Sequence, residues 1–86
     1  MPRYLTMHTL ACLTRQGAEA LAEKLRNATT VKSCRVLVNM QEGKMVVEFE
    51  AGDRETLDAW LHTAGFHYDW VLRLELESRD GKLLSI

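Results

Sequence analysis

Histidine is the side chain in this sequence best suited to proton chemistry near neutral pH. His8 lies in an apolar, strand-like run at residues 4–13, and Glu48 and Arg73 lie in two later strand-like runs. Alternation along the strands is expected to direct all three side chains, together with Tyr4, to one face of a sheet. A histidine beside a carboxylate can be a base, a ligand or a pH-sensitive interface contact. These four residues are therefore the predicted ligand-binding candidates. An ordinary polar network of His8, Glu48 and Arg73 inside a dimer interface is the preferred interpretation.

The other two histidines suggest weaker sites. His62 falls on the outer flank of a predicted helix, where solvation is its expected role. His67, Tyr68 and Trp70 form a cluster at the start of the last long strand-like run. This cluster could rim a pocket, but packing at the edge of the core is the preferred interpretation.

The two cysteines, Cys12 and Cys34, predict no catalytic or metal site. They form no C-x-x-C motif and no zinc-ligand spacing, and no histidine is tied to either by spacing. A free cysteine packs as a small hydrophobic side chain. With no long apolar leader at the N-terminus, we expect reduced thiols and a cytoplasmic location.

Length and composition exclude several functional classes. The 86 residues suffice for one domain, with 47% apolar and 27% charged residues and a net charge of −1. No basic excess, no aromatic RNA-binding run and no glycine-rich phosphate loop is present, so no nucleic acid or nucleotide partner is expected. No apolar run is long enough to cross a bilayer, so no membrane partner is expected. No cofactor and no metal is predicted.

The spacing of apolar residues predicts two amphipathic helices on a sheet. The helical stripes share i, i+3, i+4, i+7 spacing: Ala18, Leu21, Ala22 and Leu25, then Leu57, Trp60, Leu61 and Ala64. Thr14 and Asp53 are suitable N-caps, and Gly65 is a suitable stop. Strands are predicted at residues 4–13, 31–40, 44–50 and 68–77, and a turn at 79–82 can lead to a short fifth strand at 82–86.

This order of elements is β-α-β-β-α-β, the ferredoxin-like α+β arrangement. We expect a single domain over residues 1–86, an antiparallel sheet in the order 4-1-3-2, and both helices on one face. An open α+β meander is the less favoured alternative.

Strand alternation then assigns residues to the two faces of the sheet. The expected helix side is Leu5, Met7, Ala11, Val36, Val38, Met40, Met45, Val47, Phe49, Leu72, Leu74 and Leu76. The expected opposite side is Tyr4, Thr6, His8, Leu10, Leu37, Asn39, Val46, Glu48, Val71, Arg73 and Glu75. This second face is too apolar for a solvated sheet, so we predict a homodimer that buries it.

A family resemblance extends this interpretation over nearly the whole chain. The segments that carry it are Met1-Pro2-Arg3-Tyr4-Leu5, Glu50-Ala51-Gly52-Asp53-Arg54-Glu55 and Ala64-Gly65-Phe66. With these segments the chain resembles the dimeric α+β barrel proteins, and more loosely the small nickel-binding-type ferredoxin-like proteins. The resemblance implies pairing of open sheets and, in the nickel-binding type, imidazole ligands on the strands. The second strand here offers Arg35, Leu37 and Asn39 in their place.

Three functions follow from these observations, in order of preference. The first is a homodimeric binding or interaction module with a small-molecule pocket or a filled interface between the sheets. The second is a cofactor-free isomerase or monooxygenase acting on a hydrophobic substrate, with His8 as base or donor and Arg73 holding an anionic oxygen. The third is a metal-binding protein that uses His8 and His67. The sequence does not decide whether the protein is an enzyme.

Overall fold

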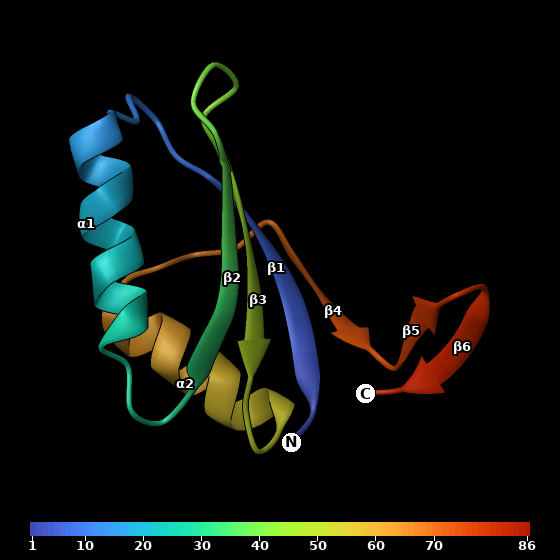
Figure 1. Ribbon diagram of the computed structural model, residues 1–86. Helices are drawn as coiled ribbons and strands as arrows, with labels where there is room; N and C mark the ends of the chain where they lie inside the picture. The colour runs from blue at the N-terminus through green and yellow to red at the C-terminus, as the bar shows by residue number, and fades with distance from the viewer.

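A computed structural model describes the whole chain, residues 1–86. The elements are β1 (Arg3–Thr9), α1 (Arg15–Arg26), β2 (Lys32–Asn39), β3 (Lys44–Glu50), α2 (Arg54–Ala64), β4 (Trp70–Leu74), β5 (Leu76–Arg79) and β6 (Lys82–Ser85). The first six elements follow the predicted order β-α-β-β-α-β (Figure 1). None of the helices is both long and apolar enough to pass through a membrane.

Local sequence signals fix both ends of α2 and the start of α1. The Thr14 hydroxyl accepts a hydrogen bond from the backbone N–H of Gly17 at 3.0 Å, and the Asp53 carboxylate accepts one from Thr56 at 2.7 Å. Each cap satisfies one N–H group that has no partner inside its helix. Gly65 ends α2 in the left-handed conformation, with φ at 68°.

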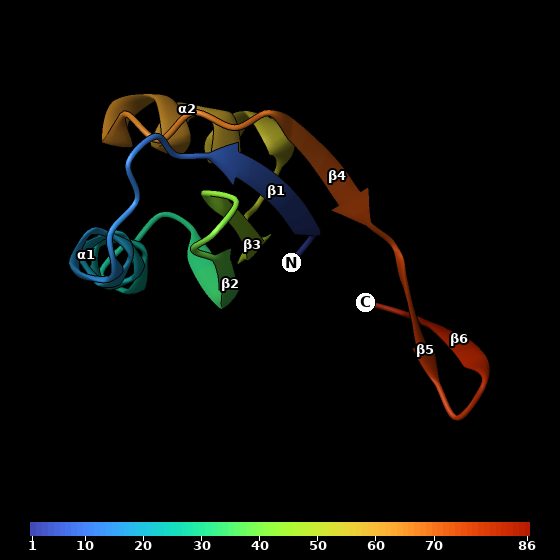
Figure 2. The ribbon, with the colours of Figure 1, turned by 90° about the horizontal axis from the view of Figure 1, so that it is seen from above.

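The main sheet has four antiparallel strands in the order β2-β3-β1-β4, which confirms the predicted order. Both helices lie on the same side of this sheet, and its other side carries no helix (Figures 1 and 2). The core forms between the helices and the sheet. Its most deeply buried side chains include Phe49, Met45 and Val47 from β3, Leu25 from α1 and Leu57 from α2.

The predicted faces are right for β2 and β3 and wrong for β1 and β4. Tyr4, Thr6 and His8 are buried on the helix side, because β1 pairs them with Phe49, Val47 and Met45. The same pairing puts Leu5 and Met7 on the helix-free side. Leu72 of β4 pairs with Leu5, so it lies on the helix-free side as well. The sequence prediction is the reverse, because Leu5 and Met7 are the most hydrophobic residues of β1.

Hydrogen bonding explains why the more polar set is buried. The Thr6 hydroxyl lies 2.7 Å from Nε2 of His8, and Nδ1 of His8 lies 2.7 Å from the carbonyl oxygen of His67. No buried side-chain polar atom lacks a partner. A buried polar group is destabilising chiefly when it lacks a partner, so Thr6 and His8 can occupy core positions.

The C-terminal segment differs from the expected long fourth strand. The strand-like run after Tyr68 divides into β4 and β5, and β6 pairs with β5 in a separate two-stranded sheet. The predicted fifth strand therefore exists, but it does not join the main sheet. The β5–β6 hairpin projects from the end of β4, on the side of the sheet away from the helices (Figures 1 and 2).

Candidate functional site

The candidate site is the helix-free side of the main sheet, which we call the open face. Strand register assigns to it Arg3, Leu5, Met7, Arg35, Leu37, Val46, Glu48, Glu50, Trp70, Leu72 and Leu74. Its apolar residues come from all four strands of the sheet. A contiguous apolar surface of this kind is typical of an interaction site.

Large apolar side chains on the open face are well exposed. Leu37 on β2 is 52% exposed, and Trp70 and Leu72 on β4 are 42% and 53% exposed. Leu5, Met7 and Val46 between them are half-buried. The expectation of an apolar uncovered face is therefore supported, with Leu37 and Val46 in place as predicted. Of the other residues predicted there, Tyr4 is in the core, and Leu10 and Val71 pack against it.

The charges on the open face are partly paired. The Arg3 guanidinium lies 3.3 Å from a carboxylate oxygen of Glu48 and 3.3 Å from one of Glu50. Arg35 is exposed and forms no ion pair within the chain. The face thus carries both signs of charge around its apolar residues.

The four residues predicted to bind a ligand do not form one site. Tyr4 and His8 are buried on the helix side, whereas Glu48 lies on the open face. Arg73 on β4 pairs with Tyr4 on β1, so it lies on the helix side of the sheet as Tyr4 does, but its side chain is exposed. The arrangement of His8 with Glu48 is therefore wrong, because it depended on the inverted face of β1.

His8 sits in a closed structural environment. Its ring stacks on Phe66, and both ring nitrogens have hydrogen-bonding partners. Burial lowers the pKa of His8 below its ordinary value of 6.5, although the hydrogen bond to His67 and the charge of Asp69 act in the opposite direction. The neutral ring is therefore favoured. A base that is fully buried on the helix side has no access to a substrate on the open face.

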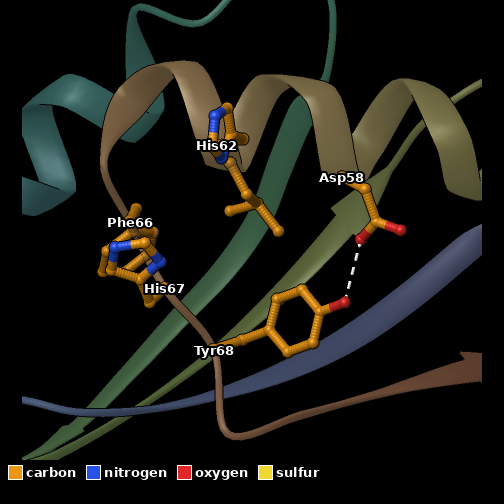
Figure 3. Close-up of a pocket in the computed structure, with 6 residues that line it drawn as sticks. Asp58, His62, Phe66, His67 and Tyr68 are labelled. Carbon is orange, nitrogen blue, oxygen red and sulfur yellow. Dashed lines mark hydrogen bonds between the residues drawn. The ribbon is translucent and has the colours of Figure 1, made fainter.

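A hollow outside the open face lies between α2 and the segment that follows this helix (Figure 3). It has a volume of about 340 Å³, and its wall includes Asp58, His62, His67 and Tyr68. The Tyr68 hydroxyl donates to Asp58 at 3.0 Å and accepts from Arg54 at 3.0 Å, while Arg54 also binds Asp58. These polar groups satisfy one another. The imidazoles of His62 and His67 in the same wall are exposed and form no side-chain hydrogen bond within the chain, and they belong to no group of three metal-ligating side chains.

The aromatic cluster predicted at residues 67–70 is divided between surfaces. Tyr68 packs against the core, which agrees with the preferred interpretation, whereas Trp70 lies on the open face opposite Met7. The His67 side chain is exposed, and its backbone carbonyl binds His8. No group of three or more His, Cys, Asp or Glu residues is arranged to hold a metal ion.

The cysteines are separate and differ in exposure. Cys12 is exposed and Cys34 on β2 is half-buried, and neither is in a disulfide. Burial, followed by the charge of Glu50, raises the pKa of the Cys34 thiol. The protonated thiol is a poor nucleophile and a poor metal ligand.

The open face also contains a hollow of about 440 Å³ toward the ends of β2 and β3. Met7, Leu37 and Val46 supply apolar walls, and Asn39 and Lys44 supply polar ones. The sequence reasoning missed Leu5, Met7, Trp70, Leu72 and Leu74 as open-face residues. The available signal was the Thr6–His8 spacing, since residues two apart on a strand share a face and can bond to each other.

Comparison with known proteins gives no match. No protein-family model, no curated protein and no solved structure matches the chain. The fold and the surface chemistry described above therefore carry the functional argument by themselves.

Proposed function

We propose that this protein is a homodimeric interaction module that associates through the open face of its sheet. The observation that carries the proposal is the exposure of Leu37, Trp70 and Leu72 on one continuous, helix-free surface. Pairing of two open faces would give each copy a second apolar layer on the uncovered side of its sheet.

The surface area of the single chain supports this proposal. A compact monomer of 9.8 kDa exposes about 5,200 Å². This chain exposes 5995 Å². The excess of about 800 Å² is comparable to what one partner contributes to an interface of standard size. Burial of apolar area on this scale would favour association.

The charges are compatible with self-association. A two-fold dimer places the same patch on both copies, so each patch must be complementary to itself. Arg35 on β2 is a free positive charge, and Glu48 and Glu50 share the single positive charge of Arg3. An acidic residue of one copy can therefore meet Arg35 of the other. The hollow beside Leu37 is the place where a small apolar ligand could be enclosed or where the interface could be filled.

The proposal is tested with a charge on the open face. Leu37→Glu buries an unpaired carboxylate in the dimer, and this carries a large desolvation cost. The control is Ala20→Glu, on the exposed side of α1. Sedimentation equilibrium of the parent chain should show a dimer at micromolar concentration. The Kd should rise by about tenfold or more for Leu37→Glu, and it should be unchanged for Ala20→Glu.

Two results would contradict the proposal. A parent chain that remains monomeric at about 100 μM, well above the concentrations at which specific dimers assemble, would remove it. A dimer that resists Leu37→Glu but is weakened by Ala20→Glu would move the interface to the helices.

A further inference from the structure

The β5–β6 hairpin is a detached element that the fold of the single chain does not use. It forms its own two-stranded sheet, and all eight of its strand residues are exposed. Isolated two-stranded hairpins are marginally stable in water unless an apolar face is covered. The hairpin therefore has the properties of an arm whose packing partner is missing from the single chain.

The two faces of this hairpin differ in chemistry. Its register pairs Leu76 with Ser85 and Ser78 with Leu83, so these four uncharged residues share one face. The other face carries Glu77, Arg79, Lys82 and Leu84. In the sequence, Leu76 continues the alternation of Trp70, Leu72 and Leu74, the open-face residues of β4, although the hairpin forms a separate sheet. The uncharged face of the hairpin thus matches the open face in chemistry.

The connection to β4 holds the hairpin away from its own sheet. Only Glu75 separates β4 from β5, and its carbonyl accepts a hydrogen bond from the N–H of Ile86 at 3.1 Å. The hairpin consequently leaves the sheet at the end where Leu74 pairs with Arg3, and it points outward (Figure 2). Folding back over its own β4 would require a reversal at this single residue.

We propose that the hairpin is an exchange arm: in the dimer, Leu76 and Leu83 of one copy pack on the open face of the second copy. This inference rests on the proposed dimerisation and adds the segment that completes it. Exchange of a terminal element between identical chains needs no new complementary surface, because both copies already carry the arm and the face. The arm also accounts for part of the excess exposed area of the single chain.

The receiving surface is the hollow formed by Met7, Leu37 and Val46 of the second copy. It lies toward the Thr9–Lys44 end of the sheet, and its apolar residues share the row Met7–Val46–Leu37, four residues along β1 from Arg3, or about 13 Å. Leu37 is also three strands away from β4, or about 14 Å across the sheet. A strand of four residues spans about 13 Å, so a copy's own hairpin would not reach Leu37 even after folding back. A two-fold axis that lies in the interface obliquely to the strands brings the arm, which leaves the edge strand β4 of one copy, over the opposite edge, β2 and β3, of the other.

The experiment mixes two samples of the full chain, one labelled with ¹³C and ¹⁵N and one unlabelled. Isotope-filtered NOE spectra then report only contacts between copies. We expect cross-peaks between the methyl groups of Leu83 in one copy and those of Leu37 or Val46 in the other. A dimer whose intermolecular cross-peaks connect only sheet residues would overturn the arm and leave the dimer standing. Leu83 cross-peaks to the sheet in the unfiltered spectrum of the labelled chain, with none in the filtered spectrum, would also overturn it, and a monomer would remove both proposals.

A matched pair of variants provides an independent measurement. Leu83→Glu and Leu84→Glu place the same charge at neighbouring positions of β6, on opposite faces of the hairpin. We expect Leu83→Glu to raise the dimer Kd by about tenfold or more and Leu84→Glu to change it by less than about threefold. Both positions are exposed in the single chain, so the four-stranded domain should remain folded. Equal effects of the two variants would overturn the proposal.

Discussion

The ring of His8 stacks on the ring of Phe66, with centroids 3.8 Å apart and planes inclined by 10°. This contact joins β1 to the end of α2, because Phe66 directly follows Gly65, the residue that terminates that helix. Since a carbonyl oxygen only accepts hydrogen bonds, Nδ1 of His8 must donate to His67. In the neutral ring, Nε2 then accepts from the Thr6 hydroxyl.

The first prediction is that His8 makes the stability of the protein depend on pH. The folded state lowers the pKa of His8, chiefly through burial. The unfolded chain therefore binds a proton at a higher pH than the folded chain does. The stability gained from neutral His8 is fully present above about pH 6.5 and is lost as the pH falls through the lowered pKa. Urea denaturation between pH 7.5 and 4.5 should show this decline.

Two variants separate His8 from other titrating groups. His8→Gln should make unfolding less dependent on pH across this range, although it lowers stability at pH 7 through the lost stacking. His62→Gln changes an exposed histidine on α2 and should retain the dependence of the parent chain. The assignment to His8 fails if both variants keep the same slope.

The sequence was sufficient to predict the order of elements, because each signal there is local. Thr14, Asp53 and Gly65 mark helix ends through contacts within a few residues. The face of β1 could not be predicted in the same way, because the more hydrophobic side chains, Leu5 and Met7, lie on the open face and the polar Thr6 and His8 lie in the core. The buried position of His8 depends on its hydrogen bond to the distant His67 and on the pairing of β1 with β3.

The same error determined what was predicted for the site. An inverted β1 brought His8 beside Glu48, and the inversion of β4 brought Arg73 to them. The apolar character of the uncovered face was still predicted correctly, because Leu37 and Val46 keep their positions and the inversion exchanges one apolar set for another. The turn and the short last strand were predicted, but the separation of this hairpin from the main sheet was not, because alternation continues through Glu75 without a break.

The second prediction concerns Trp60 on α2, which was expected in the core. The side chain is half-buried and packs on Phe49, with ring centroids 6.1 Å apart and planes inclined by 58°. Because one part of the ring stays in contact with water, Trp60→Ala should lower the free energy of unfolding by about 3 kcal/mol, the lower end of the range for large aromatic residues. Chemical denaturation followed by circular dichroism measures this loss.

The matched control is Trp70→Ala, which removes the other tryptophan from the open face. Trp70 is not among the residues that pack on the core. Its removal should leave the unfolding free energy of the monomer nearly unchanged when measured in the Leu37→Glu background, where the dimer is weakened. A larger loss of stability for Trp70→Ala than for Trp60→Ala would show that the core extends to the other side of the sheet.

The third prediction concerns Gly43, which lies between β2 and β3. Its φ is +66°, and a Cβ there would lie 2.7 Å from the carbonyl oxygen of Leu10, too close to be accommodated without movement of backbone. Gly65 has nearly the same φ, +68°, but has no atom within 4 Å of the corresponding position. Gly65→Ala should therefore lower the free energy of unfolding only by the cost of the left-handed conformation, about 1–2 kcal/mol.

Gly43→Ala should lower the free energy of unfolding by this amount plus the cost of separating Leu10 from the turn. The N–H of Leu10 also donates a hydrogen bond to the Gly43 carbonyl at 2.8 Å. We expect a total of about 2–3 kcal/mol, since a lost backbone hydrogen bond adds about 1 kcal/mol to the 1–2 kcal/mol of the left-handed conformation. Urea denaturation of the two variants under one set of conditions measures the difference, and equal losses would show that the contact with Leu10 is unimportant for stability.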